Sequence, residues 1–488
     1  MGKFGKILKK FPRTFWVANS MEMFERIAWY GLFTVLALYL TGSTDEGALG
    51  FSQSQKGQMM GIVTAILYLL PLITGAIADR IGYKKMLIYA YVVYSSGYLM
   101  MSTFTEYYSV FASFLWVALG AAMFKPVISA TVTKTTDKET SSIGFGIFYM
   151  IVNVGGFVGP FIASKLRHSG DGNSWKLVFY MSVAAILTNL ILVLLFYKEP
   201  EREKSDKKTG EVIKNSINNI LTALKDTKLL IFLIIMIGFW TMFNQLFYTL
   251  PNFLDQWIDT SVLYNALYEI SPWLANAFGT DAGDIAPEMI INLDAGMIVL
   301  IQVLVSALVM KLKPVNAIIT GIIVNAIGIG LAFATNNAFY VILGIVIFAI
   351  GEMASSPKFT EYVGRIAPKG KEALYMGTSF LPVAAGNFFT GFLSGNVYQM
   401  ISDKTSLLKK EVASRGLDIP EISKTFSQNQ YFETAAKQMG MSKAELTQYL
   451  WDTYHPDHIW YIFSAIGIVT VLGLFIYDKF VLKSKRED

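Results

Sequence analysis

The chain has 488 residues, of which 53% are hydrophobic and 16% charged, and its formal net charge is +5. A soluble protein carries about a quarter charged residues, so this composition excludes an ordinary soluble domain and indicates an integral membrane protein. The absence of cysteine excludes disulfides, thiol catalysis and thiolate metal sites. Cytoplasmic lysines and arginines orient membrane proteins, so the positive charge does not indicate nucleic acid, and we predict no nucleic-acid partner.

Apolar runs long enough to cross a lipid bilayer recur along the chain. At roughly 20 residues per span, twelve spans use about 240 residues, which leaves about half of the chain for loops and ends. The sequence therefore predicts an all-α membrane protein with twelve transmembrane helices. The predicted spans are 15–41, 56–78, 86–104, 109–131, 143–165, 176–197, 229–254, 290–310, 314–336, 338–357, 373–400 and 458–482.

Basic residues predict the orientation, because they concentrate in cytoplasmic loops. They follow the fourth, sixth and eighth spans and flank both ends of the chain. We therefore expect the cytoplasmic (inner) membrane, with both termini in the cytoplasm. The N-terminal stretch has no small-residue cleavage site and has Lys6 where myristoylation requires Ser or Thr, so neither a cleaved signal nor a lipid anchor is predicted. The basic residues are Lys134 and Lys138, the lysines of 198–228, Lys311 and Lys313, and at the ends Lys3, Lys6, Lys9, Lys10, Arg13, Lys483, Lys485 and Arg486.

Three segments between the spans indicate the domain organisation. Residues 198–228 separate six spans from six, and an apolar stripe in their second half predicts an amphipathic helix at the cytoplasmic interface. We therefore expect an N-terminal six-helix bundle (1–197), a cytoplasmic linker (198–228) and a C-terminal six-helix bundle (229–488). The insertions 258–289 and 402–457 belong to the C-terminal half and are predicted to be extracytoplasmic and helical. They make either one extracytoplasmic cap or two unrelated ordered loops.

Two acids and one base lie close together in the first span. Glu25 and Arg26 follow Glu22 by three and four residues, so all three side chains can share one helix face and bond to each other. Charge inside a span is costly and by default indicates a functional site. A satisfied structural pair is the alternative, but two acids and one base leave a surplus carboxyl that can bind and release a proton.

The remaining charges inside spans are few and divide between the two halves. Lys125 precedes Pro126 in the fourth span, Asp294 lies near the outer end of the eighth, and Glu352 lies in the tenth. The first half thus supplies Arg26 and Lys125, and the second supplies the acids. This division suits a dipolar ligand bound between the halves. Tyrosine hydroxyls at Tyr30 and Tyr68 add polar groups to the same walls.

Motifs in both halves resemble those of one transporter family. Two six-helix bundles joined by a linker is the layout of the major facilitator superfamily, and within it the chain resembles the proton-coupled oligopeptide transporters. The combination of ExxER, FYxxxNxG and GExxxSP is specific, whereas GAIADR is a general facilitator motif. The matches are ExxER with Trp29, Tyr30 and Gly31, GAIADRIGYKK (75–85), Lys125-Pro126 with Ser129, FYMIVNVGG with Asn153, FWTMFNQ, GEMASSP with Glu352, and MGTSFLPVAAGN with Asn387.

The resemblance implies a symporter in which a proton gradient drives uptake of dipeptides and tripeptides by alternating access. Arg26 and Lys125 would receive the peptide carboxylate, Glu352 with Asn153 the ammonium end, and Glu22 with Glu25 the protons. No cofactor and no metal is implied, and we expect a functional monomer. The resemblance assigns the substrate site to Arg26, Tyr30, Tyr68, Lys125, Asn153, Glu352 and Asn387.

The sequence also departs from the family pattern. Phe33 stands where a second arginine is common, and Asn244 where many members have an acid before Gln245. We expect Asp294 to take over part of the task of that missing acid in proton coupling, or else to cap the outer end of its helix. Two further departures are Val127 and Ser379. The substrate can therefore be another amine-bearing or zwitterionic metabolite, or the chain can be a non-transporting receptor on the same scaffold.

Two weaker features leave alternatives open. Lys125 can be a structural partner of Glu25 as well as a ligand for the substrate. His455 and His458, with Asp452 and Asp457, have a spacing that could bind a metal, but Pro456 favours a turn, and we predict no metal site. The chain has no HExxH, P-loop or nucleophile-elbow motif, so we expect it not to be an enzyme.

Overall fold

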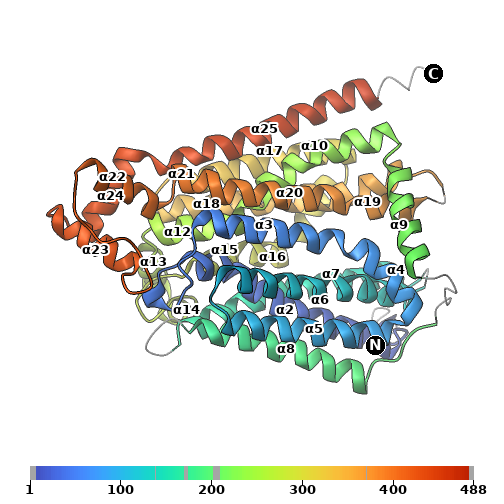
Figure 1. The fold of residues 1–488 in the computed structure, drawn as a ribbon. Helices are drawn as coiled ribbons and strands as arrows, with labels where there is room; N and C mark the ends of the chain where they lie inside the picture. Colours follow the sequence, from blue (N-terminus) through green and yellow to red (C-terminus); the bar gives the residue numbers. More distant parts are fainter. Residues whose placement is uncertain (1–6, 138, 170–173, 202–208, 370, 483–488) are drawn as a thin grey trace.

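The computed structural model describes residues 7–137, 139–169, 174–201, 209–369 and 371–482 (Figure 1). Within these ranges the chain forms helices and no strands, which confirms the prediction of an all-α protein. Residues 202–208 of the predicted linker lie outside the described residues. The same holds for these basic residues that carried the orientation: Lys3, Lys6, Lys138, Lys483, Lys485 and Arg486.

The helices of the first half precede a separate helix, α9 (Thr209–Ala223), which packs against α4 and α19. Most of them are single rods, but α3 and α4 meet at a 43° bend. Pro71 begins α4 at this bend, where its fixed backbone angle and missing N–H are tolerated. The helices are α2 (Arg13–Thr41), α3 (Gln53–Leu69), α4 (Pro71–Ile81), α5 (Tyr83–Thr103), α6 (Tyr107–Lys134), α7 (Ser141–Arg167) and α8 (Trp175–Leu195).

Several spans of the second half are broken. The seventh predicted span is divided at Asn244 and Thr249 into α10, α11 and α12, and the eighth at Asn292 into α15 and α16. The helices are α10 (Thr227–Phe243), α11 (Gln245–Tyr248), α12 (Leu250–Trp257), α15 (Pro287–Ile291), α16 (Leu293–Val309), α17 (Pro314–Phe333), α18 (Ala338–Ile366), α19 (Glu372–Thr378), α20 (Phe380–Phe392), α21 (Tyr398–Ile401) and α25 (Ile459–Ile476).

The number of continuous spans is smaller than the sequence predicts. Among the described residues, nine helices are long and apolar enough to cross a membrane, or ten if α3 and α4 count as one span. The remaining two predicted spans correspond to α5 and to 373–400. The predicted span 373–400 is helical but not one continuous helix, because the chain breaks at Ser379 and forms a π turn at Leu393–Val397 before α21. In that turn Gly395 lies directly against the backbone of α3.

Buried apolar side chains form two large clusters. One extends from Phe11 to Tyr197 and includes Tyr248, and the other extends from Ala223 to Tyr477. The two halves of the chain therefore bury most of their apolar side chains separately, and the polar side chains that concern function lie between them.

The two insertions fold into helices at the end of the molecule opposite α9 (Figure 1). We call these the insertion end and the α9 end. Residues 258–289 carry α13 (Ser261–Ile270) and α14 (Pro272–Phe278), as predicted. A capping box formed by Ser442 and Glu445 begins α24. The second insertion consists of α22 (Lys404–Ser414), α23 (Gln428–Gln438) and α24 (Lys443–Tyr454).

Each insertion bonds to the opposite half of the molecule. The ammonium of Lys165 on α7 donates to the carbonyls of Asn276 and Gly279, at 2.9 and 2.7 Å. Asn429 on α23 donates through its backbone N–H to Ser43 Oγ at 3.1 Å. The insertions therefore connect the two halves at the insertion end.

A buried lysine lies under these contacts. Lys56 on α3 is fully buried, and its ammonium donates to the carbonyl of Tyr248 at 3.0 Å and to Asn252 Oδ1 at 3.1 Å. Asn252 in turn donates to Thr41 Oγ1 at 2.6 Å. The sequence did not single out Lys56, because a lysine at the edge of an apolar run resembles one that reaches the membrane surface. We call Lys56, Asn252 and Thr41 the outer gate.

Glycines let α3 and α20 touch through their backbones beside the outer gate. A Cβ atom at Gly57 would clash with the carbonyl oxygen of Gly391, and one at Gly61 would lie 2.9 Å from the Gly391 Cα. Close approach of two helices is what glycine permits in membrane proteins. The insertion end is thus closed by backbone contact and by the bonds of Lys56.

We expect Gly57→Ala to hold the insertion end open. Overpacking costs about 1–3 kcal/mol, so the closed population falls about fivefold or more. Cysteines at Ser54 and Asn396, whose side chains lie 3.0 Å apart, report closure by cross-linking in this cysteine-free chain. Gly146→Ala is the control, because a Cβ there meets nothing within 4 Å. Equal cross-linking of all three proteins would contradict the assignment.

Candidate functional site

The ExxER residues form a buried cluster on α2. Arg26 Nε lies 3.0 Å from Glu22 Oε1, and Arg26 Nη2 pairs with Glu25 Oε2. Glu25 also accepts a hydrogen bond from the Tyr94 hydroxyl at 3.0 Å. All three charged side chains are less than a tenth exposed. The predicted cluster therefore exists, with two carboxyls on one guanidinium.

A glycine of the FYxxxNxG motif positions this cluster. A Cβ atom at Gly155 on α7 would lie 2.7 Å from the Arg26 Cβ and 2.8 Å from the Met23 carbonyl oxygen. The absence of a side chain lets α7 lie directly against α2. Two residues earlier, Asn153 donates to the carbonyl of Tyr149 at 2.9 Å. The motif thus supports α2 and presents Asn153 beside it.

Lys125 lies above an aromatic ring, and no acid among the described residues pairs with it. Its ammonium is 4.8 Å from the centre of the Tyr68 ring, a favourable cation–π distance. The carboxylate of Glu25, its expected structural partner, is bonded to Arg26 and Tyr94 instead. Among the described residues no carboxylate lies within ion-pair distance of Lys125. The ammonium is thus available to a ligand.

A cavity of about 80 Å³ lies between the halves. Tyr30 and Asn153 line it from the first half, and Asp294 and Glu352 line it from the second. A volume of this size holds a few water molecules. The cavity is therefore a polar gap that would have to widen to hold a larger molecule.

The two acids of the second half meet at this cavity. The carboxyl groups of Asp294, in the first turn of α16, and of Glu352 on α18 lie close enough to interact. Two negative charges this close in a buried site repel each other, so the pair can bind a proton or a cation. Asp294 Oδ1 and Glu352 Oε2 are buried without a partner among the described residues. A buried acceptor without a donor requires an explanation, and a cationic ligand group would supply the donor.

The helix containing Asp294 begins inside its span, and this break positions the carboxyl. Asn292, between α15 and α16, donates to the carbonyl of Phe157 on α7 at 2.9 Å. Its side chain does not cap α16. Asp294 thus stands near a helix N-terminus, as the capping alternative requires, but its carboxyl lies against Glu352. The role of Asp294 in proton binding stays a prediction.

The structure brings together part of the predicted substrate site. Tyr30, Asn153 and Glu352 line the cavity, while the Arg26 guanidinium lies 5.8 Å from the Tyr30 ring centre. Lys125 and Tyr68 lie beside each other outside the cavity lining. Asn387 is apart from it, because its side chain accepts from the Tyr248 hydroxyl at 2.8 Å and donates to the carbonyl of Val383.

The two departures Phe33 and Asn244 are accounted for by packing. The Phe33 ring stacks on Trp29 with centroids 5.2 Å apart and meets the Tyr248 ring edge-on at 5.7 Å. Asn244 lies at the break between α10 and α11 and donates to the carbonyl of Trp240 at 2.8 Å. Phe33 therefore makes an aromatic contact between the halves at a position where the family commonly has a second arginine.

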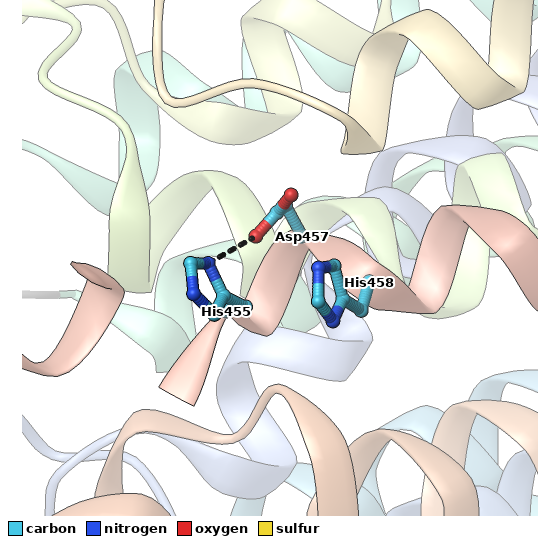
Figure 2. A group of neighbouring side chains, drawn as sticks. All are labelled: His455, Asp457 and His458. Atoms are coloured by element: carbon cyan, nitrogen blue, oxygen red, sulfur yellow. Dashed lines mark ion pairs between the residues drawn. The ribbon is translucent and has the colours of Figure 1, made fainter. Parts of the chain in front are cut away.

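The histidine cluster lies away from this site, at the start of α25 (Figure 2). His455, Asp457 and His458 place one donor atom each within 4.8 Å of one another. His455 adopts a left-handed backbone conformation (φ 49°), so Pro456 begins a turn as the sequence predicts. A zinc site takes four donors at about 2.0–2.2 Å from the ion, and these three side chains supply three of them.

Comparisons with known proteins agree with this architecture. Residues 20–283 match the family model described as Major Facilitator Superfamily. A di-/tripeptide transporter of Lactococcus lactis subsp. cremoris is 25% identical over 257 residues, which are 51% of this chain and 49% of that protein. The matched segments cover between 36% and 49% of the lengths of the curated relatives.

Solved structures show the same fold over nearly the whole chain. The crystal structure of a peptide transporter POT in complex with sulfate has a TM-score of 0.68 and 16% identity and covers 100% of this chain and 96% of that one. A crystal structure of a mutant of the nucleoside transporter NupG has a TM-score of 0.67 and 12% identity, covering 95% and 99%. The fold is thus equally similar to those of two transporters whose names give different substrates. The substrate of this chain must therefore be argued from its site.

Proposed function

The chain belongs to the major facilitator superfamily, and we propose that it is a symporter that uses a proton gradient to import dipeptides and tripeptides. The sequence matches to di-/tripeptide transporters and the fold of the peptide transporters support a place in the oligopeptide transporter family. In this proposal the insertion end faces outward and the α9 end faces the cytoplasm. The chain then lies in the cytoplasmic membrane with both termini inside, and it works as a monomer.

The division of charge between the halves carries the proposal. Arg26 and Lys125 lie on helices of the first half, and Asp294 and Glu352 lie on helices of the second. A planar guanidinium suits a carboxylate, and paired acids suit an ammonium group. Every peptide with free ends carries both groups. The two halves are then drawn together by a ligand that bonds to each.

Proton coupling follows from the number of acids. The candidate site has four acids and two bases, so its net charge is −4 + 2 = −2 when all are ionised. The acids are Glu22, Glu25, Asp294 and Glu352, and the bases are Arg26 and Lys125. Such an excess is not stable in a low-dielectric site, since like charges favour protonation of a carboxyl. The empty site therefore holds one or two protons. A peptide ammonium entering between Asp294 and Glu352 bonds to these acids, while the surplus carboxyl of Glu22 and Glu25 carries the coupled proton in the same direction as the ligand.

Uptake into liposomes containing the purified protein tests the proposal. We expect a labelled dipeptide to accumulate when the outside is more acidic, and to equilibrate without accumulation when the gradient is collapsed. Unlabelled dipeptides should compete, whereas single amino acids and nucleosides should not. Competition by another amine-bearing metabolite alone would identify the alternative substrate class. Failure of every zwitterion to enter would favour a receptor.

We expect Asp294→Asn to change the pH dependence of uptake more than its maximal rate. The amide removes one carboxyl from the pair, and the acid arm of the pH profile shifts to lower pH by the release of like-charge repulsion. Uptake of lysine-containing peptides should fall relative to neutral ones, because one anionic group is lost.

The measurement is initial uptake of a neutral and a lysine-containing dipeptide across a pH series. Asp259→Asn is the control, because that carboxyl caps Ser261 at the insertion end, and asparagine caps equally well. An unchanged pH profile together with an unchanged ranking of the two peptides would leave Asp294 as a helix-terminal residue only.

A further inference from the structure

A second and much larger cavity lies at the insertion end. Its volume is about 620 Å³, enough for a peptide of two or three residues. Its walls come from α2, α7 and α12 and from the insertion 402–457. Thr41 and Asn252 of the outer gate lie in its lining. The cavity therefore lies next to the closed contact between the halves, on the side away from the substrate site.

One wall presents an ammonium group held among aromatic rings. Lys404, the first residue of α22, has its Nζ 5.3 Å from the Trp257 ring centre and 5.2 Å from that of Phe432. It donates to Thr447 Oγ1 at 3.2 Å. Within the described part of the chain no carboxylate lies within ion-pair distance of it. The amine is thus oriented by its surroundings but not neutralised.

A carboxyl group faces the same space from α12. Asp255 is enclosed by the surrounding protein but exposed to the cavity, and the described residues offer it no hydrogen bond. It lies close enough to Lys404 for their charges to interact. Other cavity charges are already bonded: Arg167 pairs with Glu288 at 2.9 Å, and Lys443 pairs with Glu433. Lys404 and Asp255 are therefore a cation and an anion on two different walls of the cavity. Each can still bond to a ligand.

We propose that this cavity, which we call the outer vestibule, is a receiving site for zwitterionic peptides. Lys404 binds the peptide carboxylate, Asp255 binds the ammonium group, and the Trp257 and Phe432 rings contact apolar side chains. The peptide then waits above the outer gate until the gate opens. The inference rests on the proposed function for the direction of transport and the class of substrate. It assigns a task to the insertion 402–457, which supplies Lys404 and Phe432.

The pH range in which the vestibule can bind a peptide follows from the charges of Lys404 and Asp255. Burial lowers the pKa of Lys404 to about 8, and burial raises the pKa of Asp255 to about 6. Both groups are charged between these values, so capture weakens as the pH rises through about 8 and as it falls through about 6. The other charged groups that face the pair are Glu46 on the loop after α2, Arg167 on α7, Asp259 after α12, Glu288 on α15 and Lys443 on α24.

Transport kinetics test the proposal in the full-length protein. Lys404→Gln and Asp255→Asn should each raise the KM for a neutral dipeptide about three- to tenfold, the effect of one partly exposed charge contact, with kcat within a factor of two. Exchanging the two charges, Asp255→Lys with Lys404→Asp, should recover part of the loss. Lys443→Gln and Asp259→Asn are matched controls, because they make the same chemical changes in the same cavity at groups that already have partners.

Direct binding separates this inference from the proposed function. In a protein carrying Lys125→Ala and Glu352→Ala, a labelled dipeptide should still bind weakly, and adding Lys404→Gln should remove that binding. If the wild type transports dipeptides but neither KM nor weak binding depends on Lys404 and Asp255, the vestibule is wrong and the transporter stands. If the weak site binds dipeptides but none are transported, the vestibule stands and the proposed function is wrong.

Discussion

Replacing Glu22 or Glu25 with glutamine will abolish proton-driven accumulation of substrate and will leave exchange of substrate across the membrane in place. The two carboxyls share one guanidinium, that of Arg26, so one of them is in surplus and can carry the coupled proton. An amide keeps the size and hydrogen bonding of the side chain but cannot bind and release a proton. The gradient then no longer drives the cycle, although the ligand still can.

Two assays in the same liposomes measure this. Accumulation under an imposed gradient should fall to the equilibrium level in each variant, while counterflow of labelled dipeptide against unlabelled dipeptide inside should persist. Glu106→Gln is a matched control, because Glu106 makes an exposed ion pair with Lys424 of the second insertion at 2.7 Å. Concentrative uptake by both Glu22→Gln and Glu25→Gln would exclude the ExxER residues as the coupling site.

Lys125→Ala and Glu352→Ala will each remove high-affinity binding. Each change leaves one charged end of the ligand without its partner in a desolvated site, which costs about 2–5 kcal/mol. The dissociation constant should therefore rise about thirtyfold to several thousandfold. Equilibrium binding of a dipeptide to the purified protein measures it. Lys134→Ala serves as control, since Lys134 ends the same helix and also lies over a tyrosine ring.

An esterified dipeptide identifies which end Lys125 binds. Methylation of the carboxylate should weaken binding to the wild type strongly and binding to Lys125→Ala only slightly, because the variant has already lost that contact. The ester should still bind more tightly to the wild type than to Glu352→Ala, because its ammonium group is unchanged. Equal losses in wild type and Lys125→Ala would show that Lys125 does not receive the carboxylate.

The sequence predicted the fold well because the bilayer restricts it. Apolar runs must be helical in lipid, so the all-α membrane architecture and the facilitator fold are confirmed. The breaks were not predicted. Asn244, Ser379 and Asn292 interrupt spans at positions where the apolar pattern continues. The side chains of Asn244 and Ser379 bond to carbonyls of the preceding turn, at Trp240 and Met376. The π turn that contains Gly395 was not predicted either, because it depends on contact with the backbone of α3.

The candidate site was predictable where its residues are close in sequence. Glu22, Glu25 and Arg26 meet because helical spacing places them on one face, and that follows from the sequence alone. The pairing of Asp294 with Glu352 depends on how α16 packs against α18, which no local pattern encodes. Asp255 and Lys404 were missed for a related reason, because charged residues in loops are normally solvated. Only the fold encloses them.

The buried ammonium of Lys56 makes the transport cycle depend on water. When the insertion end opens, Lys56 exchanges its bonds to Tyr248 and Asn252 for hydration, and the glycine surfaces of α3 and α20 become wet. The outward-open form therefore holds more water than the closed form. Solutes that are excluded from protein surfaces favour burial, so high osmotic pressure outside should slow outward opening. The rate at which the protein resets would then fall as the cell's surroundings become more concentrated.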